Sequence, residues 1–204
     1  MRKLIVAVFV SLDGVIQAPG GPDEDTSDGF AHGGWFWPYA DPGQPVMGGV
    51  FQHPFELLLG RRTYDIFAAY WPHVPEGGPH QHIADLFNGT AKHVATHKPE
   101  SLAWQHSRAL GPDVAAAVRE IKRGDGPNLV TQGSSDLVHQ LLTTDLVDEL
   151  RLLICPVLLG RGKRLFDDRA QASAFRLEES KTSSTGVLIN RYVREGDVRT
   201  GSFE

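Results

Sequence analysis

Cysteine is nearly absent from this chain of 204 residues, in which Cys155 is the single example. One thiol cannot form an intrachain disulfide, so a disulfide framework is excluded. Cys155 lies in the apolar segment 152–157, and this setting favours a buried, unreactive thiol over a nucleophile. The Gly-x-Ser-x-Gly elbow of serine hydrolases is missing as well.

Long apolar runs and long basic runs are also missing. No apolar stretch approaches the roughly 20 residues of a membrane-spanning helix. The formal net charge is −5, with no extended tract of Lys and Arg, so we expect neither a membrane nor a nucleic acid as a partner. Residues 1–10 are similar to the start of a signal peptide, but their apolar core is about seven residues long and no cleavage site follows directly. We interpret them as a strand and expect a cytoplasmic protein.

Two familiar kinds of ligand motif do not occur. The Rossmann G-x-G-x-x-G spacing is missing, and so is the Walker Gly-Lys-Ser/Thr. His80-Gln81-His82 suggests a metal at first sight, but no His or Cys pair at ligand spacing accompanies it. We therefore expect no metal site.

The segments that remain alternate between strand and helix patterns. Residues 4–10 form a nearly continuous apolar, β-branched run, which is typical of a strand buried on both faces of a sheet. Further strands are predicted at 55–59, 92–96, 128–131, 146–159, 175–179 and 187–193, and helices at 63–70, 83–88, 112–123 and 136–143. This order predicts one domain over residues 1–204, a three-layer α/β/α fold with a mixed, mostly parallel central sheet. The long segment 17–54 is rich in Gly, Pro and aromatic residues, which is typical of a functional loop, with a short helix near 46–53.

Two strand-to-helix junctions share one design. Residues 57–64 read LLLGRRTY and residues 128–137 read NLVTQGSSDL, so in each an apolar strand ends near a glycine and a helix begins. A helix start presents unpaired backbone N–H groups and a positive dipole end, which suit a phosphate. Two such junctions about 70 residues apart indicate a ligand with more than one phosphate, and a nucleotide cofactor is the leading candidate.

These junctions occur together with SLDGVI at residues 11–16 and with PVLLGRGKRLF at residues 156–166. In this order they resemble the dihydrofolate reductase fold, and most closely the C-terminal reductase domain of bifunctional riboflavin-biosynthesis deaminase-reductases. The resemblance implies NADPH as the cofactor. It implies that the phosphates are held by Gly60, Arg61, Arg62, Thr63, Gly133, Ser134 and Ser135, that Thr96, His97 and Lys98 lie near the adenosine side, and that Leu12, Gly14 and Val15 lie beside the nicotinamide.

Each of these assignments has a plainer alternative. Arg61 and Arg62 would oppose the dipole of the helix that they begin, and a bound phosphate would offset this cost, but they can also be solvated surface charges. Ser134 stands where the family often has a second glycine, and Ser is also an ordinary helix cap. The turn at 96–98 can equally be a solvated loop.

The acid of the reaction is not identified by the sequence. Dihydrofolate reductases carry a carboxylate on their first helix, but here this region is the irregular segment 17–54, and the carboxylates available are Asp28, Asp41 and Glu56. Asp41 lies near Trp37 and Tyr39, so it is a weak candidate for a half-buried acid of raised pKa, and an exposed loop Asp is the alternative. We interpret Asp13 as a turn former rather than an acid.

Aromatic residues in the same segment provide the substrate hypothesis. Trp35, Phe36, Trp37 and Tyr39 are suited to stack on a flat heteroaromatic ring, or alternatively to anchor the loop to the core. The sequence therefore predicts an NADPH-dependent reductase that transfers a hydride to a small pterin- or aminopyrimidine-like heterocycle. A non-catalytic binder of the same fold is the alternative. The resemblance also implies a homodimer formed through the apolar segments 150–159 and 187–193.

Overall fold

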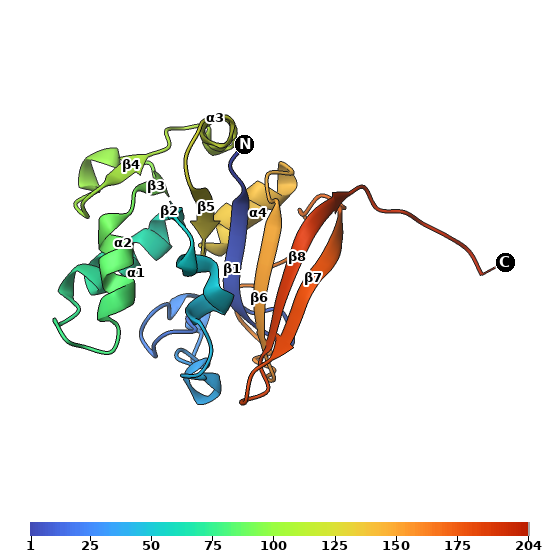
Figure 1. The fold of residues 1–204 in the computed structure, drawn as a ribbon, viewed down its shortest axis with the longest axis horizontal. Coiled ribbons are helices and arrows are strands. Elements are labelled where there is room, and N and C mark those ends of the chain that lie inside the picture. The colour runs from blue at the N-terminus through green and yellow to red at the C-terminus, as the bar shows by residue number, and fades with distance from the viewer. Residues whose placement is uncertain (204) are drawn as a thin grey trace.

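A computed structural model describes residues 1–203 (Figure 1). Eight strands form one sheet in the order β4-β3-β2-β5-β1-β6-β8-β7. The strands are β1 (Leu4–Ser11), β2 (Phe55–Gly60), β3 (Lys92–Ala95), β4 (Ser107–Ala109), β5 (Asn128–Thr131), β6 (Glu149–Cys155), β7 (Ala174–Thr182) and β8 (Leu188–Gly196). Strands β1 to β6 pair in parallel, and β8 pairs antiparallel with both β6 and β7. The mixed, mostly parallel sheet is therefore confirmed, although the predicted domain extends to residue 204, which lies outside the described residues.

Helices cover both faces of this sheet. They are α1 (Arg61–Tyr70), α2 (Gln81–Gly89), α3 (Val114–Arg123) and α4 (Ser135–Thr143). Along β1 the side chains alternate between two buried clusters, because successive residues of a strand point to opposite faces. Ile5 and Ala7 join the cluster that includes Tyr64 of α1 and Phe87 of α2, while Leu4, Val6 and Val8 join the cluster that includes residues of α3 and α4. The three-layer architecture follows from this alternation.

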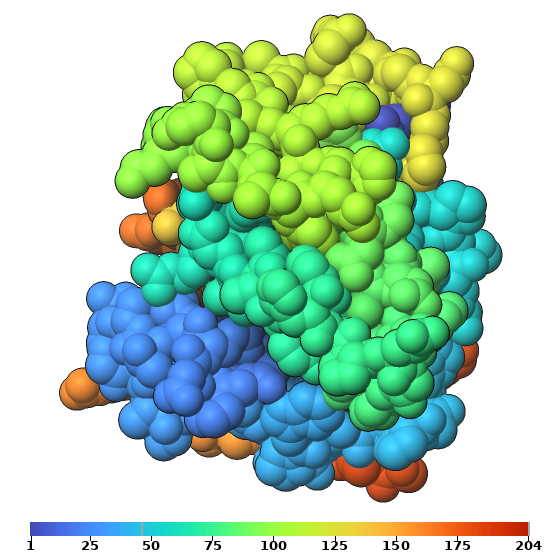
Figure 2. Space-filling model, turned by 90° about the vertical axis from the view of Figure 1, so that its left-hand side faces the viewer, coloured from blue at the N-terminus to red at the C-terminus, as the bar shows by residue number. Residues whose placement is uncertain are grey.

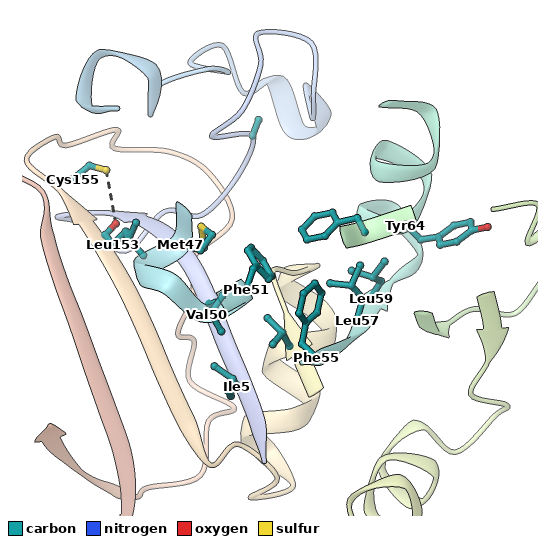
Figure 3. Close-up of a cluster of buried hydrophobic side chains, with 14 of the residues drawn as sticks. Ile5, Met47, Val50, Phe51, Phe55, Leu57, Leu59, Tyr64, Leu153 and Cys155 are labelled. Atoms are coloured by element: carbon teal, nitrogen blue, oxygen red, sulfur yellow. Dashed lines mark hydrogen bonds between the residues drawn. The ribbon is translucent and has the colours of Figure 1, made fainter. Parts of the chain in front are cut away.

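The first of these clusters is rich in aromatic side chains. Figure 3 shows Phe51 and Phe55 facing each other near Leu57 and Leu59, and the centroids of the two phenyl rings lie 4.9 Å apart. Cys155 lies at the edge of this cluster with its side chain fully buried. Burial raises the pKa of the Cys155 thiol to about 12, which favours the protonated, unreactive form, and the predicted burial of this thiol is confirmed.

The path of the chain divides at the carboxyl ends of two central strands. From β2 the chain passes through α1 and α2 on one face to β3, and from β5 it passes through α4 on the other face to β6. The strands β2 and β5 are neighbours, so the chain leaves two adjacent carboxyl ends in opposite directions. Ligands of open α/β sheets bind at such a switch point.

Three local features differ from the sequence prediction. The strand predicted at 146–159 is limited to Glu149–Cys155. Before this strand, the amide of Asp148 donates to Leu4 O and its carboxylate accepts from Leu4 N. After the strand, Val157 N donates to Cys155 O, which turns the chain. Strand β4 was not predicted, because three residues carry no periodic signal. The helix expected near 46–53 is a 3₁₀ segment, Val46–Gln52, interrupted by residues of positive φ such as Met47 and Gly48.

No helix within residues 1–203 combines the length and the apolar character that crossing a bilayer requires.

Candidate functional site

The two predicted junctions meet at the carboxyl ends of β2 and β5. The Gly60 amide donates a hydrogen bond to the Gly133 carbonyl at 3.2 Å. A methyl group on Gly60 would lie 2.8 Å from the backbone nitrogen of Ser134, so a side chain larger than hydrogen does not fit there. Gly133 has a φ of +134°, a conformation that favours glycine, and a methyl group on it would lie 3.0 Å from Thr63 Oγ1. Two glycines thus allow two strand ends and two helix starts to touch.

Both helices at this contact begin without a side-chain cap. Gly60 precedes α1 and Ser134 precedes α4, and neither provides a capping hydrogen bond. Asp113, by contrast, caps α3 by accepting a hydrogen bond from Ala116 N at 2.9 Å. The amides of the first turns of α1 and α4 are therefore free of side-chain partners and can bind an anion.

A cleft of about 1580 Å³ opens in front of these helix starts. Figure 2 shows it as a hollow between the blue segment that follows β1 and the teal helix α1. Ligand pockets commonly measure roughly 300–1,000 Å³, so this cleft has room for two ligands side by side. Its lining includes residues 60–63, 95–97 and 132–137 on one side, and Phe36, Trp37, Tyr39, Phe67, Tyr70 and Trp71 on the other.

Arg61 is held by groups of the protein. Its Nε lies 2.9 Å from both carboxylate oxygens of Asp65, and its Nη1 donates to Thr96 Oγ1 at 3.2 Å and to Ser101 Oγ at 2.6 Å. The residue thus fastens the turn after β3 to the start of α1. Thr96 and His97 line the cleft, whereas Lys98 lies outside its lining.

Arg62 forms an ion pair with Asp25, whose other carboxylate oxygen accepts a hydrogen bond from Lys163 Nζ at 2.7 Å. Asp25 is 8% exposed. Burial raises the pKa of Asp25, but the hydrogen bonds from Lys163 and Ser27 outweigh it and bring the pKa to about 2. The carboxylate is therefore ionised and joins three segments that are far apart in the sequence.

The ion pairs of Arg61 and Arg62 remove one reason for expecting a bound phosphate. Two cations at a helix start oppose the helix dipole, and the sequence suggests a phosphate to offset this unfavourable interaction. The carboxylates of Asp65 and Asp25 already provide that offset, so the inference from this cost is wrong, while the free amides still favour an anion. Asp25 and Lys163 were missed because nothing in a single sequence marks a pair separated by more than 130 residues.

The turn after β1 differs from the implied arrangement. Leu12 is 60% exposed, Val15 is fully buried, and among the described residues neither these nor Gly14 lines the cleft. Ala7, Val8 and Phe9 of β1 line the cleft, and after this turn the lining resumes at Ile16 and continues through residue 25. The turn folds toward residues 157–165, so the assignment of Leu12, Gly14 and Val15 to the cofactor gains no support from the cleft and stays a prediction.

Asp13 holds this turn in place. Its carboxylate accepts hydrogen bonds from Ser11 Oγ at 2.7 Å, Leu159 N at 3.1 Å and Gly160 N at 2.8 Å. Partial burial raises the pKa of Asp13, but these hydrogen bonds lower it to about 2. The interpretation of Asp13 as a turn former is confirmed.

The predicted aromatic residues divide into two groups. Trp35 is buried and its Nε1 donates to Gln17 O at 2.7 Å, so it anchors the loop to the core and does not line the cleft. Its assignment to the substrate is wrong. Trp37 is 51% exposed, and both Trp37 and Tyr39 line the cleft. The contact of these two side chains with substrate stays a prediction.

The pKa shifts of the carboxylates in the cleft differ from those expected from the sequence. Asp41 lines the cleft but accepts hydrogen bonds from Ser184 N at 2.9 Å and Ser184 Oγ at 2.8 Å, and these bonds lower its pKa. The expectation of a raised pKa at Asp41 is therefore wrong. Glu24, which also lines the cleft, has a raised pKa because burial and the nearby charge of Asp25 outweigh its hydrogen bonds from Gly20 N and Gly21 N. The sequence does not predict the raised pKa of Glu24, because its cause is burial in a loop whose path the sequence does not show.

Asp28 and Glu56 lie away from the large cleft. Asp28 lines a separate small pocket, and the Glu56 carboxylate binds Arg2 and His93. Within residues 1–203, no cluster of three or more His, Cys, Asp or Glu side chains is arranged as metal ligands.

Comparison with known protein families identifies one that matches most of the chain. The family model described as the RibD C-terminal domain matches residues 2–189. The chain belongs to the RibD C-terminal domain family. The match covers β1 through most of the final strand pair, and so includes both glycine junctions.

Two proteins of similar sequence come from Bacillus subtilis (strain 168). The uncharacterized protein YyaP is 26% identical over 187 residues, which cover 92% of each chain. The uncharacterized protein YwjB is 25% identical over 193 residues, which cover 95% of this chain and 98% of YwjB.

Two solved structures share the fold. A putative riboflavin biosynthesis protein from Shewanella sp. PV-4 superposes with a TM-score of 0.69 at 18% identity, covering 96% of this chain and 99% of that protein. A pyrimidine reductase-like protein from Corynebacterium diphtheriae superposes with a TM-score of 0.57 at 14% identity, covering 96% and 93%. The chain therefore has the dihydrofolate reductase-like α/β fold of RibD-type proteins.

Proposed function

We propose that this protein is an NADPH-dependent reductase acting on a small heterocycle. The contact between Gly60 and Gly133 carries the proposal, because it brings two uncapped helix starts to one cleft. The cleft also has room for a dinucleotide and a second molecule. Membership of the RibD C-terminal domain family supports the same reaction class.

The residues present fit a dinucleotide. The backbone of residues 60–63 and 133–135 would hold its phosphates, because amides at helix starts bind anions without further charge. His97, and Lys98 just beyond the lining, would be the groups nearest to a 2′-phosphate, since Arg61 and Arg62 are engaged with Asp65 and Asp25. This assignment favours NADPH over NADH.

The bound cofactor would supply a hydride, which adds to the carbon of a C=N or C=O bond of the substrate, while the adjoining nitrogen or oxygen takes up one proton. The chain's part in this reaction is to bind, to orient and to deliver that proton. Glu24 lines the cleft and its pKa is raised by burial and by the charge of Asp25, so it is the candidate donor in place of Asp41, with water as the alternative.

A non-catalytic binding protein of the same fold is the second candidate. One observation favours it: hydrogen bonds from Ser184 lower the pKa of Asp41, the acid that the sequence offered, so this carboxylate is poorly suited to donate a proton.

Titration with NADPH, followed by the change in tryptophan fluorescence at moderate salt, tests both candidates. Saturable binding together with NADPH oxidation in the presence of pterin, aminopyrimidine or quinone compounds supports the reductase. Saturable binding without oxidation across that panel supports the binder. If NADPH does not bind, both proposals fail.

We also propose a homodimer. Strands β7 and β8 form one end of the sheet, and Leu158, Leu177 and Leu188 close to it are 71%, 51% and 40% exposed. A second subunit that covers this end of the sheet would remove these apolar side chains from water.

A further inference from the structure

The two halves of the cleft differ in charge. Within the described residues, the Lys and Arg side chains that line it are Arg61, Arg62 and Lys163. Arg61 and Arg62 directly follow Gly60, and Lys163 shares the carboxylate of Asp25 with Arg62, so all three are assigned to the half with the glycine junctions. Each of them is hydrogen-bonded to the carboxylate of Asp65 or Asp25. The other half offers no lysine or arginine to an incoming ligand.

Aromatic rings form the walls of that other half. Trp37 comes from the loop after β1 and Tyr70 from the end of α1, and these side chains are 51% and 49% exposed. The ring of His80 lies 6.0 Å from the Trp37 ring and 6.5 Å from the Tyr70 ring, so the three rings together border the cleft. Phe36 lies behind Trp37, with 6.2 Å between their ring centroids.

The floor of this half is apolar and buried. It is formed by side chains such as Phe51, Phe87 and Leu153, which are 7%, 1% and 5% exposed (Figure 3 labels Phe51 and Leu153). Apart from Tyr and His side chains, the ionisable groups here are Asp41, whose pKa is lowered by its hydrogen bonds from Ser184, and Glu24, which accepts hydrogen bonds from the amides of Gly20 and Gly21 beside Trp37. A negative charge on a ligand would meet these carboxyl groups and no lysine or arginine.

We infer that the substrate half of the cleft binds a neutral, planar aromatic ring system and rejects a phosphorylated or otherwise anionic one. The inference rests on the proposed function, because it assigns the dinucleotide to the other half. Aromatic side chains grouped in this way can stack on a flat ring. A phosphate that lost its water here would gain no charged hydrogen bond in return.

Matched probes test this inference. With the protein saturated with NADP⁺, tryptophan fluorescence measures the binding of quinoxaline, of quinoxaline-2-carboxylate and of uridine 5′-monophosphate. We expect quinoxaline to bind at least about tenfold more tightly than either anion, since one unpaired charge in a poorly hydrated site costs more than 1.4 kcal/mol. If either anion binds as tightly as quinoxaline, the inference is wrong.

Variants identify the rings involved. Trp37→Ala and Tyr70→Ala should each weaken quinoxaline about five- to tenfold, the value of one aromatic pair, and leave the affinity for NADPH within twofold. Equilibrium dialysis replaces fluorescence for Trp37→Ala. The control is Phe166→Ala, a ring of similar exposure, 47%, outside the cleft lining. Equal losses in all three variants, or none, would overturn the assignment.

The same measurements separate this inference from the proposed function. Tight NADPH binding with no preference for the neutral ring refutes the inference and leaves the reductase proposal in place. Failure of NADPH to bind refutes the reductase proposal, and quinoxaline binding to the protein alone then still tests the aromatic half.

Discussion

The amide of Gly60 and the carbonyl of Gly133 are joined by a hydrogen bond of 3.2 Å, which ties the end of β2 to the loop that follows β5. Because these strands lead into helices on opposite faces, the bond fixes the place where the chain divides. The amide groups of two helix starts then point into one cleft, which is the arrangement that an anionic dinucleotide requires.

Replacement of Gly60 by alanine should disrupt this contact. The new methyl group would overlap with Ser134, so we expect a loss of about 1–3 kcal/mol in the free energy of unfolding and a clear loss of NADPH affinity. Gly89→Ala is the control, since a methyl group there meets no atom within 4 Å. Thermal unfolding and NADPH titration of both variants measure the effect; an unchanged Gly60→Ala protein would show that the close contact has no role.

Asp25→Asn should destabilise the protein because Arg62 and Lys163 lose their shared carboxylate. The pKa of Asp25 is lowered in the folded protein to about 2 from 3.8. A lowered pKa stabilises the fold above the unfolded value and stops doing so as the pH falls through the folded value. We therefore expect a loss of about 1–2 kcal/mol at neutral pH, because Arg62 is half exposed and solvent screens its share. The difference between wild type and variant should shrink between pH 4 and pH 2, as urea unfolding can show; a constant difference would contradict the ion pair.

Glu24→Gln tests the proton donor. Because the pKa of Glu24 is raised, its protonated fraction, and with it kcat, should fall as the pH rises through that pKa. The variant should lose this pH-dependent limb and have a kcat lower by about 10²-fold, a typical loss of a general acid, with the NADPH affinity retained. Asp23→Asn, at a neighbouring carboxylate that also lines the cleft, is the control. An unaltered pH profile in Glu24→Gln would assign the proton to water.

Leu188→Glu tests the homodimer. Leu188 is 40% exposed on β8, and a charge there would be buried without a partner if a second subunit covers this strand. Sedimentation velocity should show a dimer for the wild type and a monomer for the variant. Asp197→Lys, at a fully exposed side chain after β8, is the control for a change of surface charge. A monomeric wild-type protein would refute the proposal directly.

Local patterns predicted most of the fold. The apolar run of β1, the helix-forming residues of α3 and the glycines that end β2 and follow β5 are signals within a few residues, and the structure follows them closely. Strand β4 could not be predicted in this way. Its three residues form a strand because the fold brings them beside β3, and their composition does not indicate a strand.

The site was predictable where it depends on backbone and unpredictable where it depends on distant side chains. Gly60 and Gly133 are visible because a glycine between a strand and a helix marks a close backbone approach or a positive φ. The partner of Arg62 was not visible, because Asp25 is one of several acidic residues in an irregular loop, and the sequence cannot show which of them the fold brings to α1. The same limit explains Trp35: four aromatic residues close together give no sign of which one faces inward.

Fluorescence titrations with NADPH and with NADH test directly whether the joined helix starts bind a dinucleotide. We predict saturable binding at one site per chain, tighter for NADPH than for NADH, and a marked loss of affinity in Gly60→Ala but not in Gly89→Ala. Absence of saturable binding, or equal affinity of both glycine variants for NADPH, would contradict the claim that the joined helix starts hold a dinucleotide.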